Sequence, residues 1–329
     1  MRCLSQGFFR SQVVVLLTGI VFVAGSDLRG EDRVEVDQEI IGALIAKLNH
    51  GQYAVRENSK EKLLEIGSPA IPGLLRASKS ASPEQRIRAV ELLGTIRFSV
   101  IKREFTAMGK AAEEDLEVEH AMWVIALLLD PDLEEQSVTG RLDLVAAAVR
   151  KRIGAGVEPK ALPPAEVVRA LIGVLKEEFG LEGDEKSYDH PDNSSIHRVL
   201  TRRRGLPIIL SEIAVAVARR LDLPIVGVPV PGRYMIKYDG SQAPGGKQSD
   251  LIINPYDGWK ITTAAEIGRT VRFFDPREDL SASQPRATIS RILRNMHNHA
   301  VMKRQRDLEG SIEQCLLLLV PAEQPVPQP

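Results

Sequence analysis

The spacing of apolar residues changes once in a decisive way along this chain. From about residue 38 to residue 221, most apolar residues recur at steps of three and four, which is the spacing of one face of a helix. The segments that follow are short, β-branched and aromatic, which is typical of strands: residues 225–230, 233–238 and 251–254. The polar segment 239–249 fits a hairpin loop between two of them. The pattern predicts an α+β chain that is mostly helical and has one small antiparallel sheet.

An internal repeat lies in the first helical region, at a fixed offset of 30 residues. Four residues return at this offset: Arg56, Ser59, Leu63 and Ile66 recur as Arg86, Ala89, Leu93 and Ile96. Repeated helix pairs stack because one pair cannot bury its apolar face alone. Residues 38–98 resemble HEAT-like repeats, which implies one face docked on the next domain and another free for a protein partner. A purely structural helical cap is the alternative.

The first 26 residues have the features of a secretory signal. Arg2 and Arg10 supply a positively charged region at the N-terminus. An apolar run over residues 13–24 comes next, and small residues suited to cleavage lie at its end. That run is shorter than the roughly 20 residues of a spanning helix, so we expect export to the periplasm or outside the cell, with a retained membrane anchor as the alternative. Residues 27–37 are predicted to form a linker, and residues 321–329 a disordered tail.

Composition narrows the classes of function. The 329 residues include 43 Lys and Arg against 44 Asp and Glu, so no long-range field would gather nucleic acid. Cys3 would leave with the signal, and Cys315 alone cannot form an internal disulfide. No histidine pair has the spacing of a helical metal site, and no glycine-rich phosphate fingerprint is present. We therefore expect no metal and no cofactor.

The most informative stretch runs from residue 193 to residue 258. It contains RRRGLPIILSEIAVAVARRLDLPIVGVPVPGRYMIKY and, after the polar loop, LIINPYDG. These segments are similar to the SirB family of transglutaminase-like proteins. The resemblance implies a transglutaminase-like (papain-like) domain over residues 113–280. It also implies a tetratricopeptide-like helix pair over residues 285–320.

In such enzymes a cysteine at a helix N-terminus works with a histidine and an acid from neighbouring strands. By the resemblance, these three positions read Pro207, Arg233 and Asn254 here. Proline has no nucleophilic atom, and arginine stays charged and accepts no proton at neutral pH. The sequence therefore predicts the fold of a thiol enzyme but lacks the nucleophile and the base that the reaction needs. Ser211, one turn further along the helix, is the only hydroxyl near the site, and a serine without a base is a poor nucleophile.

The same positions are better suited to binding. Arg233, Asn254 and Ser211 together would form a donor-rich cleft for a carboxylate or another planar anion, and Asn193 is a further ligand-binding candidate. The alternatives are that Arg233 pairs with Asp257 or is solvated, and that Ser211 is an ordinary helix residue. The sequence thus favours an exported, non-catalytic module that binds a protein or another ligand. The competing hypothesis is a hydrolase or acyltransferase on amide bonds that uses Ser211.

Overall fold

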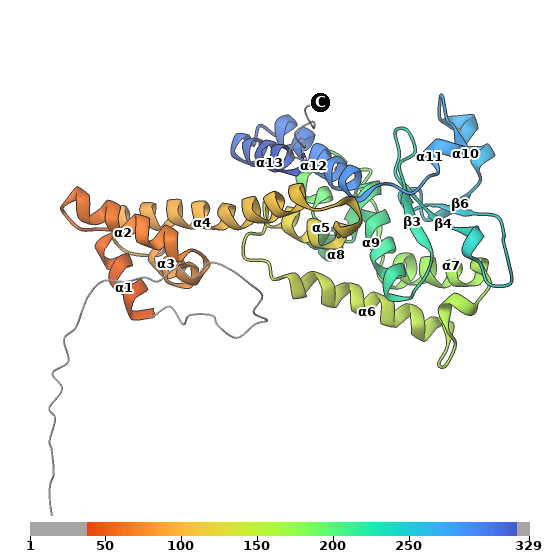
Figure 1. The fold of residues 1–329 in the computed structure, drawn as a ribbon, viewed down its shortest axis with the longest axis horizontal. Coiled ribbons are helices and arrows are strands. Elements are labelled where there is room, and N and C mark those ends of the chain that lie inside the picture. The colour runs from red at the N-terminus through yellow and green to blue at the C-terminus, as the bar shows by residue number, and fades with distance from the viewer. Residues whose placement is uncertain (1–37, 321–329) are drawn as a thin grey trace, which may run out of the picture.

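The structure is a computed structural model that describes residues 38–320, so the predicted signal, linker and tail lie outside the described residues. The described chain is elongated: the N-terminal helices cluster at one end of the long helix α4 (Pro83–Lys110), further helices surround its other end, and the sheet lies beyond those helices (Figure 1). Within residues 38–320, no helix is both long enough and apolar enough to cross a membrane.

Four helices form the N-terminal part: α1 (Gln38–Lys47), α2 (Tyr53–Ile66), α3 (Ile71–Ala77) and α4 (Pro83–Lys110). They enclose their own apolar core, which includes Leu63 and Leu93. The two repeated arginines make equivalent contacts, because Arg56 Nη1 donates to the carbonyl six residues earlier at 2.8 Å and Arg86 Nη1 does so at 2.9 Å. This is the structural counterpart of the 30-residue offset, while assignment to the HEAT class stays a prediction.

Helix α4 connects the two parts of the molecule. It begins where the Ser82 hydroxyl accepts the Gln85 N–H and where proline occupies the first turn, both favourable starts for a helix. Leu92 and Ile96 belong to the N-terminal core, whereas Ile101 and Phe105 belong to the core of the second part. One continuous helix is therefore buried in both cores.

Helices make up most of the second part of the described chain. The longer ones are α5 (Val118–Ala126), α6 (Glu135–Ile153), α7 (Pro164–Ile172), α8 (Ile196–Arg202), α9 (Pro207–Arg220), α12 (Pro285–Met302) and α13 (Arg306–Leu319). Shorter pieces are the π-helical segment η4 (Gly173–Glu178), the 3-10 segment η5 (Pro191–Ser194), α10 (Ala264–Thr270) and α11 (Pro276–Asp279). Helices α12 and α13 pack on each other, and α13 also packs along α4.

Helix α8 ends at a residue other than glycine. Arg203 takes the left-handed conformation, with φ at 65°, and its N–H donates to the Val199 carbonyl. Gly205 lies in the two-residue strand β2 (Arg204–Gly205), which pairs in parallel with β1 (Glu182–Gly183). A side chain there would collide with Val199.

The main sheet has four antiparallel strands in the order β3-β4-β5-β6. Their bounds are β3 (Ile225–Val228), β4 (Met235–Tyr238), β5 (Leu251–Asn254) and β6 (Lys260–Thr262). The first three are the strands expected from the sequence, with β4 and β5 joined as the predicted hairpin. The sequence pattern missed β6, because its three residues are mostly exposed and show no apolar alternation.

Each face of this sheet packs against a different helix. Tyr234, Ile236 and Ile253 join the core that contains α9. Met235 and Ile252 join a separate apolar cluster with Ile267 of α10. Since side chains alternate between the faces of a sheet, neighbouring residues of β4 and β5 point toward opposite helices. This alternation decides which candidate residues meet.

Candidate functional site

Helix α9 is the helix that, by the resemblance to transglutaminase-like proteins, is expected to carry the nucleophile in a thiol enzyme. Leu206 precedes it and Pro207 occupies its first turn, where the missing N–H costs nothing. Residues 208–218 of α9 are all buried. The helix N-terminus therefore presents no hydroxyl, thiol or imidazole, and α9 serves as the buried support of the sheet.

Ser211 does not join the predicted cleft. It is fully buried, and its Oγ donates to the backbone carbonyl of Tyr234 at 3.4 Å, on the α9 side of the sheet. Arg233 and Asn254 line a hollow together with Met235 and Ile267, which belong to the α10 side. The predicted set of three is thus corrected: the structure brings Arg233 and Asn254 together, and the sheet separates them from Ser211.

The hollow beside Arg233 has a volume of about 370 Å³. Arg233 precedes β4, Lys260 lies on β6 and Arg269 lies on α10. All three cations line the hollow, and within residues 38–320 none of them forms an ion pair within 4.0 Å. The alternative in which Arg233 pairs with Asp257 is therefore not the arrangement found, although Asp257 lines the same hollow.

The carboxylate of Glu266 also lines this hollow, but its hydrogen bonds cap the N-terminus of α10. In a capping box, the Thr263 N–H and the hydroxyls of Thr262 and Thr263 all donate to Glu266 Oε2, at 2.9, 2.9 and 3.3 Å. The hydrogen bond from the Thr263 backbone is the main cause that lowers the pKa of Glu266. Glu266 thus stays ionised and satisfied, which leaves the three cations without a direct carboxylate partner.

The side chain of Asn254 shapes the floor of this hollow. Its Oδ1 accepts the N–H groups of Tyr256 and Asp257 at 3.2 and 3.3 Å, so the carbonyl end holds the turn after β5. The amide Nδ2 makes no hydrogen bond within the described residues, and it remains a donor for a ligand.

Asn193 has a structural position instead. It is fully buried in η5, its Nδ2 donates to the carbonyls of Ser187 and Tyr188, and its Oδ1 accepts from Arg202. These hydrogen bonds hold the loop, and Asn193 is not among the residues that line the Arg233 hollow.

A buried polar chain lies where the α9 face of the sheet meets α12, and the sequence pattern did not reveal it. The Tyr234 hydroxyl donates to Glu212 Oε1 at 2.8 Å and lies 3.1 Å from Thr288 Oγ1, which donates to Ser283 Oγ. Burial raises the pKa of Glu212 to about 7. Most buried residues of α9 are aliphatic, and a single Glu among them gives no periodic signal.

One group of possible metal ligands crosses the helix pair. His297 of α12 and Glu309 and Glu313 of α13 each place one ligand atom within 4.8 Å of the others. Spacing along one helix could not reveal it, because the residues come from two helices. Within this group, His297 Nε2 and Glu313 Oε1 are in direct contact at 3.3 Å.

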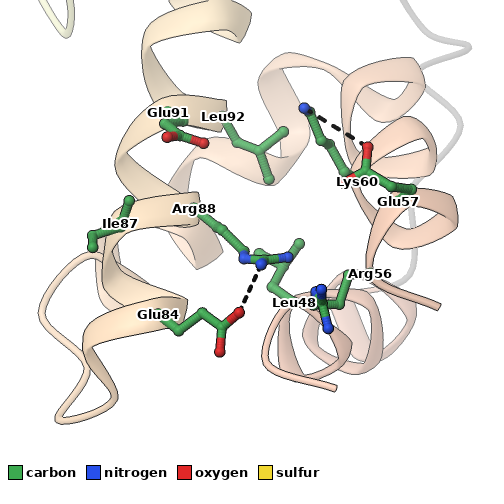
Figure 2. Close-up of a pocket in the computed structure, with 9 residues that line it drawn as sticks. All are labelled: Leu48, Arg56, Glu57, Lys60, Glu84, Ile87, Arg88, Glu91 and Leu92. Atoms are coloured by element: carbon green, nitrogen blue, oxygen red, sulfur yellow. Dashed lines mark hydrogen bonds and ion pairs between the residues drawn. The ribbon is translucent and has the colours of Figure 1, made fainter. Parts of the chain in front are cut away.

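A further hollow of about 290 Å³ lies between α2 and α4 (Figure 2). Leu48 and Leu92 are among its apolar lining residues, and charged residues of both signs surround them. Figure 2 shows two ion pairs there, Arg88 with Glu84 at 2.6 Å and Lys60 with Glu57 at 3.9 Å. Two of the three cations of this hollow are thus paired with a carboxylate, whereas none of the three at the Arg233 hollow forms an ion pair within the described residues.

Comparisons with known proteins support the transglutaminase-like domain expected from the sequence. Residues 136–294 match the family model described as the transglutaminase-like superfamily. A UPF0162 protein of Xylella fastidiosa (strain 9a5c) is 27% identical over 229 residues, which cover 66% of this chain and 76% of that protein. A UPF0162 protein of Pseudomonas aeruginosa is 28% identical over 190 residues, which cover 55% of this chain and 65% of that protein.

Protein SirB1 of Salmonella typhimurium is 22% identical over 199 residues, which cover 58% of this chain and 70% of SirB1. No solved structure gives a significant match. Residues 136–294 thus carry a transglutaminase-like domain, and the chain is similar to the UPF0162 and SirB1 proteins.

Proposed function

We propose that this chain is a non-catalytic transglutaminase-like protein whose Arg233 hollow binds a carboxylate or another planar anion. The observation that carries the proposal is the convergence of Arg233, Lys260 and Arg269 on one hollow without an ion pair. The planar fork of an arginine matches a carboxylate with two parallel hydrogen bonds, and a lysine adds a point charge. The free amide of Asn254 supplies another donor.

The chemistry of the frame supports binding over catalysis. A hydrolase or acyltransferase would need a nucleophile with an adjacent base. Ser211 is fully buried and its hydroxyl already donates to a carbonyl. The carboxylate that follows it, Glu212, accepts its hydrogen bond from Tyr234. The enzyme hypothesis with Ser211 as nucleophile is therefore the weaker of the two.

Covalent labelling separates these two hypotheses. We expect the folded protein to stay unmodified by a serine-directed fluorophosphonate, as measured by intact mass. In a chain that starts at residue 27 and so lacks Cys3, iodoacetamide should also give no modification, because Cys315 is buried and burial raises its pKa to about 12. Fluorophosphonate labelling that disappears in the Ser211→Ala variant would contradict the proposal.

We extend the proposal to location and partners. The predicted signal over residues 1–26 supports export, which cell fractionation of the full chain against a chain that starts at residue 27 would test. The N-terminal helices expose Tyr53, Ile87 and Val90 at 68%, 58% and 55%, which supports a protein partner there. A partner recovered with the wild-type chain should be lost with the Ile87→Glu, Val90→Glu double variant.

A further inference from the structure

A separate hollow of about 310 Å³ lies between α6, α8 and the segment that follows η4. Most of its lining is apolar: Leu144, Val145, Phe179, Leu181 and Leu200. The polar residues that complete the lining are Arg141, Thr201 and Arg203, and no acidic residue lines it. The hollow therefore combines an apolar surface with two positive charges.

The two arginines of this hollow differ from their neighbours. Arg198, Arg202 and Arg204 each form an ion pair, with Asp130, Asp184 and Glu182 respectively among their partners. Arg141 makes only a hydrogen bond, from Nη1 to Thr201 Oγ1 at 2.7 Å. Within residues 38–320, the Arg203 guanidinium has no hydrogen bond or ion pair. The nearby acids are thus used by other arginines.

The backbone around the hollow is irregular at two points. Arg203 has a φ of 65°, a conformation that costs free energy for a residue other than glycine. The π-helical segment η4 ends immediately before Phe179 of the hollow wall. Both left-handed residues and π-helical turns are more frequent at functional sites than elsewhere. Leu144, with 65% of its surface exposed, lines the hollow as an unusually accessible apolar side chain.

We propose that this hollow binds an aliphatic carboxylate, namely a medium-chain fatty acid. Its carboxylate would lie between Arg141 and Arg203, and its chain would lie against the apolar lining. A volume of about 310 Å³ lies at the lower end of the roughly 300–1,000 Å³ that small-molecule sites span, which suits a chain of medium length. The site differs from the Arg233 hollow, so the two proposals can fail independently.

Isothermal titration with decanoate below its micellar concentration tests the site. Decanoate should bind, whereas decanol, which lacks the charge, and acetate, which lacks the chain, should bind at least about tenfold more weakly. A peptide that ends in leucine with a free carboxylate should also bind more weakly than decanoate. The absence of decanoate binding, or tighter binding of that peptide, would overturn the fatty-acid assignment.

Two variants place the binding in this hollow. Arg203→Gly removes one charge and suits the left-handed backbone, so the fold should be retained. Leu144→Glu places a negative charge at an exposed position of the lining. We expect Arg203→Gly to weaken decanoate binding about fivefold or more and Leu144→Glu to abolish it.

The matched controls lie outside the hollow. Arg204→Ala removes the next arginine, and Leu317→Glu adds a charge at an exposed leucine of α13, 75% exposed. Both should bind decanoate as the wild-type chain does. Equal affinity of all four variants would overturn the proposal.

Discussion

Glu212 is a carboxylic acid in an environment that its residue type rarely occupies. Its carboxyl group is buried between α9 and the sheet, and burial is the main cause that raises its pKa to about 7. The Tyr234 hydroxyl and the charge of Arg219 oppose this rise only in part. On the far side of Tyr234, the Arg291 guanidinium lies over the ring at 5.3 Å and donates to the Arg233 carbonyl. Residues 233 and 234 are therefore fixed by contacts with both α9 and α12.

This burial makes stability depend on pH. Because the folded pKa of about 7 exceeds the ordinary value of 4.5, the neutral Glu212 contributes stability that is complete below pH 4.5 and is lost as the pH rises through 7. Relative to Glu212→Gln, the wild-type chain should lose on the order of 2 kcal/mol between pH 5 and pH 8. Urea unfolding of both proteins at the two pH values measures this difference. A constant difference would show that Glu212 titrates normally.

The hydrogen-bonded side chains of Tyr234 and Glu212 leave no room for a side chain at Gly227. A Cβ at this position would lie 2.4 Å from Tyr234 Oη and 2.6 Å from Glu212 Oε1. Gly227→Ala should therefore destabilise the protein by about 1–3 kcal/mol in denaturant unfolding. Gly94→Ala is the control, because no atom lies within 4 Å of its Cβ in α4 and the change should stabilise by about 0.5–1 kcal/mol. Equal effects of the two substitutions would contradict this packing account.

At the scale of helices and strands, sequence periodicity predicted the strands near 225–254 and the start of α9 at Pro207, since both depend on local preferences. It did not predict which face of the sheet α9 covers. That face depends on strand pairing and on helices distant in sequence. Arg233 and Ser211 were therefore expected in one cleft, although Tyr234 is the neighbour that faces α9. The loop position of Asn193 was equally hidden, because its partners come from the surrounding fold.

The capping box of α10 includes Glu266, which also lines the Arg233 hollow. Thr263→Ala removes the hydroxyl that accepts the Glu266 N–H, so α10 should lose about 1 kcal/mol of stability. The Glu266 side chain would then be freer to pair with Lys260 or Arg269, which line the same hollow. Thermal unfolding tests the first effect. Thr263→Ser, which keeps the hydroxyl, should behave as the wild-type chain, and an equal loss in both variants would exclude the cap as the cause.

At the scale of the whole molecule, α4 connects the N-terminal helices with the second part of the chain (Figure 1). Its side chains are buried in the apolar cores of both parts. The repeat predicted the N-terminal helix pairs, but no local pattern showed that the second helix of the repeat continues to Lys110 and packs against α13. The transglutaminase-like frame then holds two separate hollows, at Arg233 and at Arg203, in regions that carry unpaired arginines. Residues 136–294 match the transglutaminase-like superfamily, and by the resemblance Pro207, Arg233 and Asn254 stand at the positions expected for the catalytic residues.

The central claim is that Arg233 binds an anion where the superfamily frame would place a catalytic histidine. Isothermal titration of the wild-type chain, Arg233→Ala and the surface control Arg272→Ala with citrate, succinate and inorganic phosphate tests it most directly. We predict that at least one of these anions binds the wild-type and Arg272→Ala chains equally, and binds Arg233→Ala about tenfold more weakly or worse, as expected for the loss of a charged hydrogen bond. Binding of every one of these anions to Arg233→Ala with wild-type affinity, or no binding to the wild-type chain, would contradict the claim.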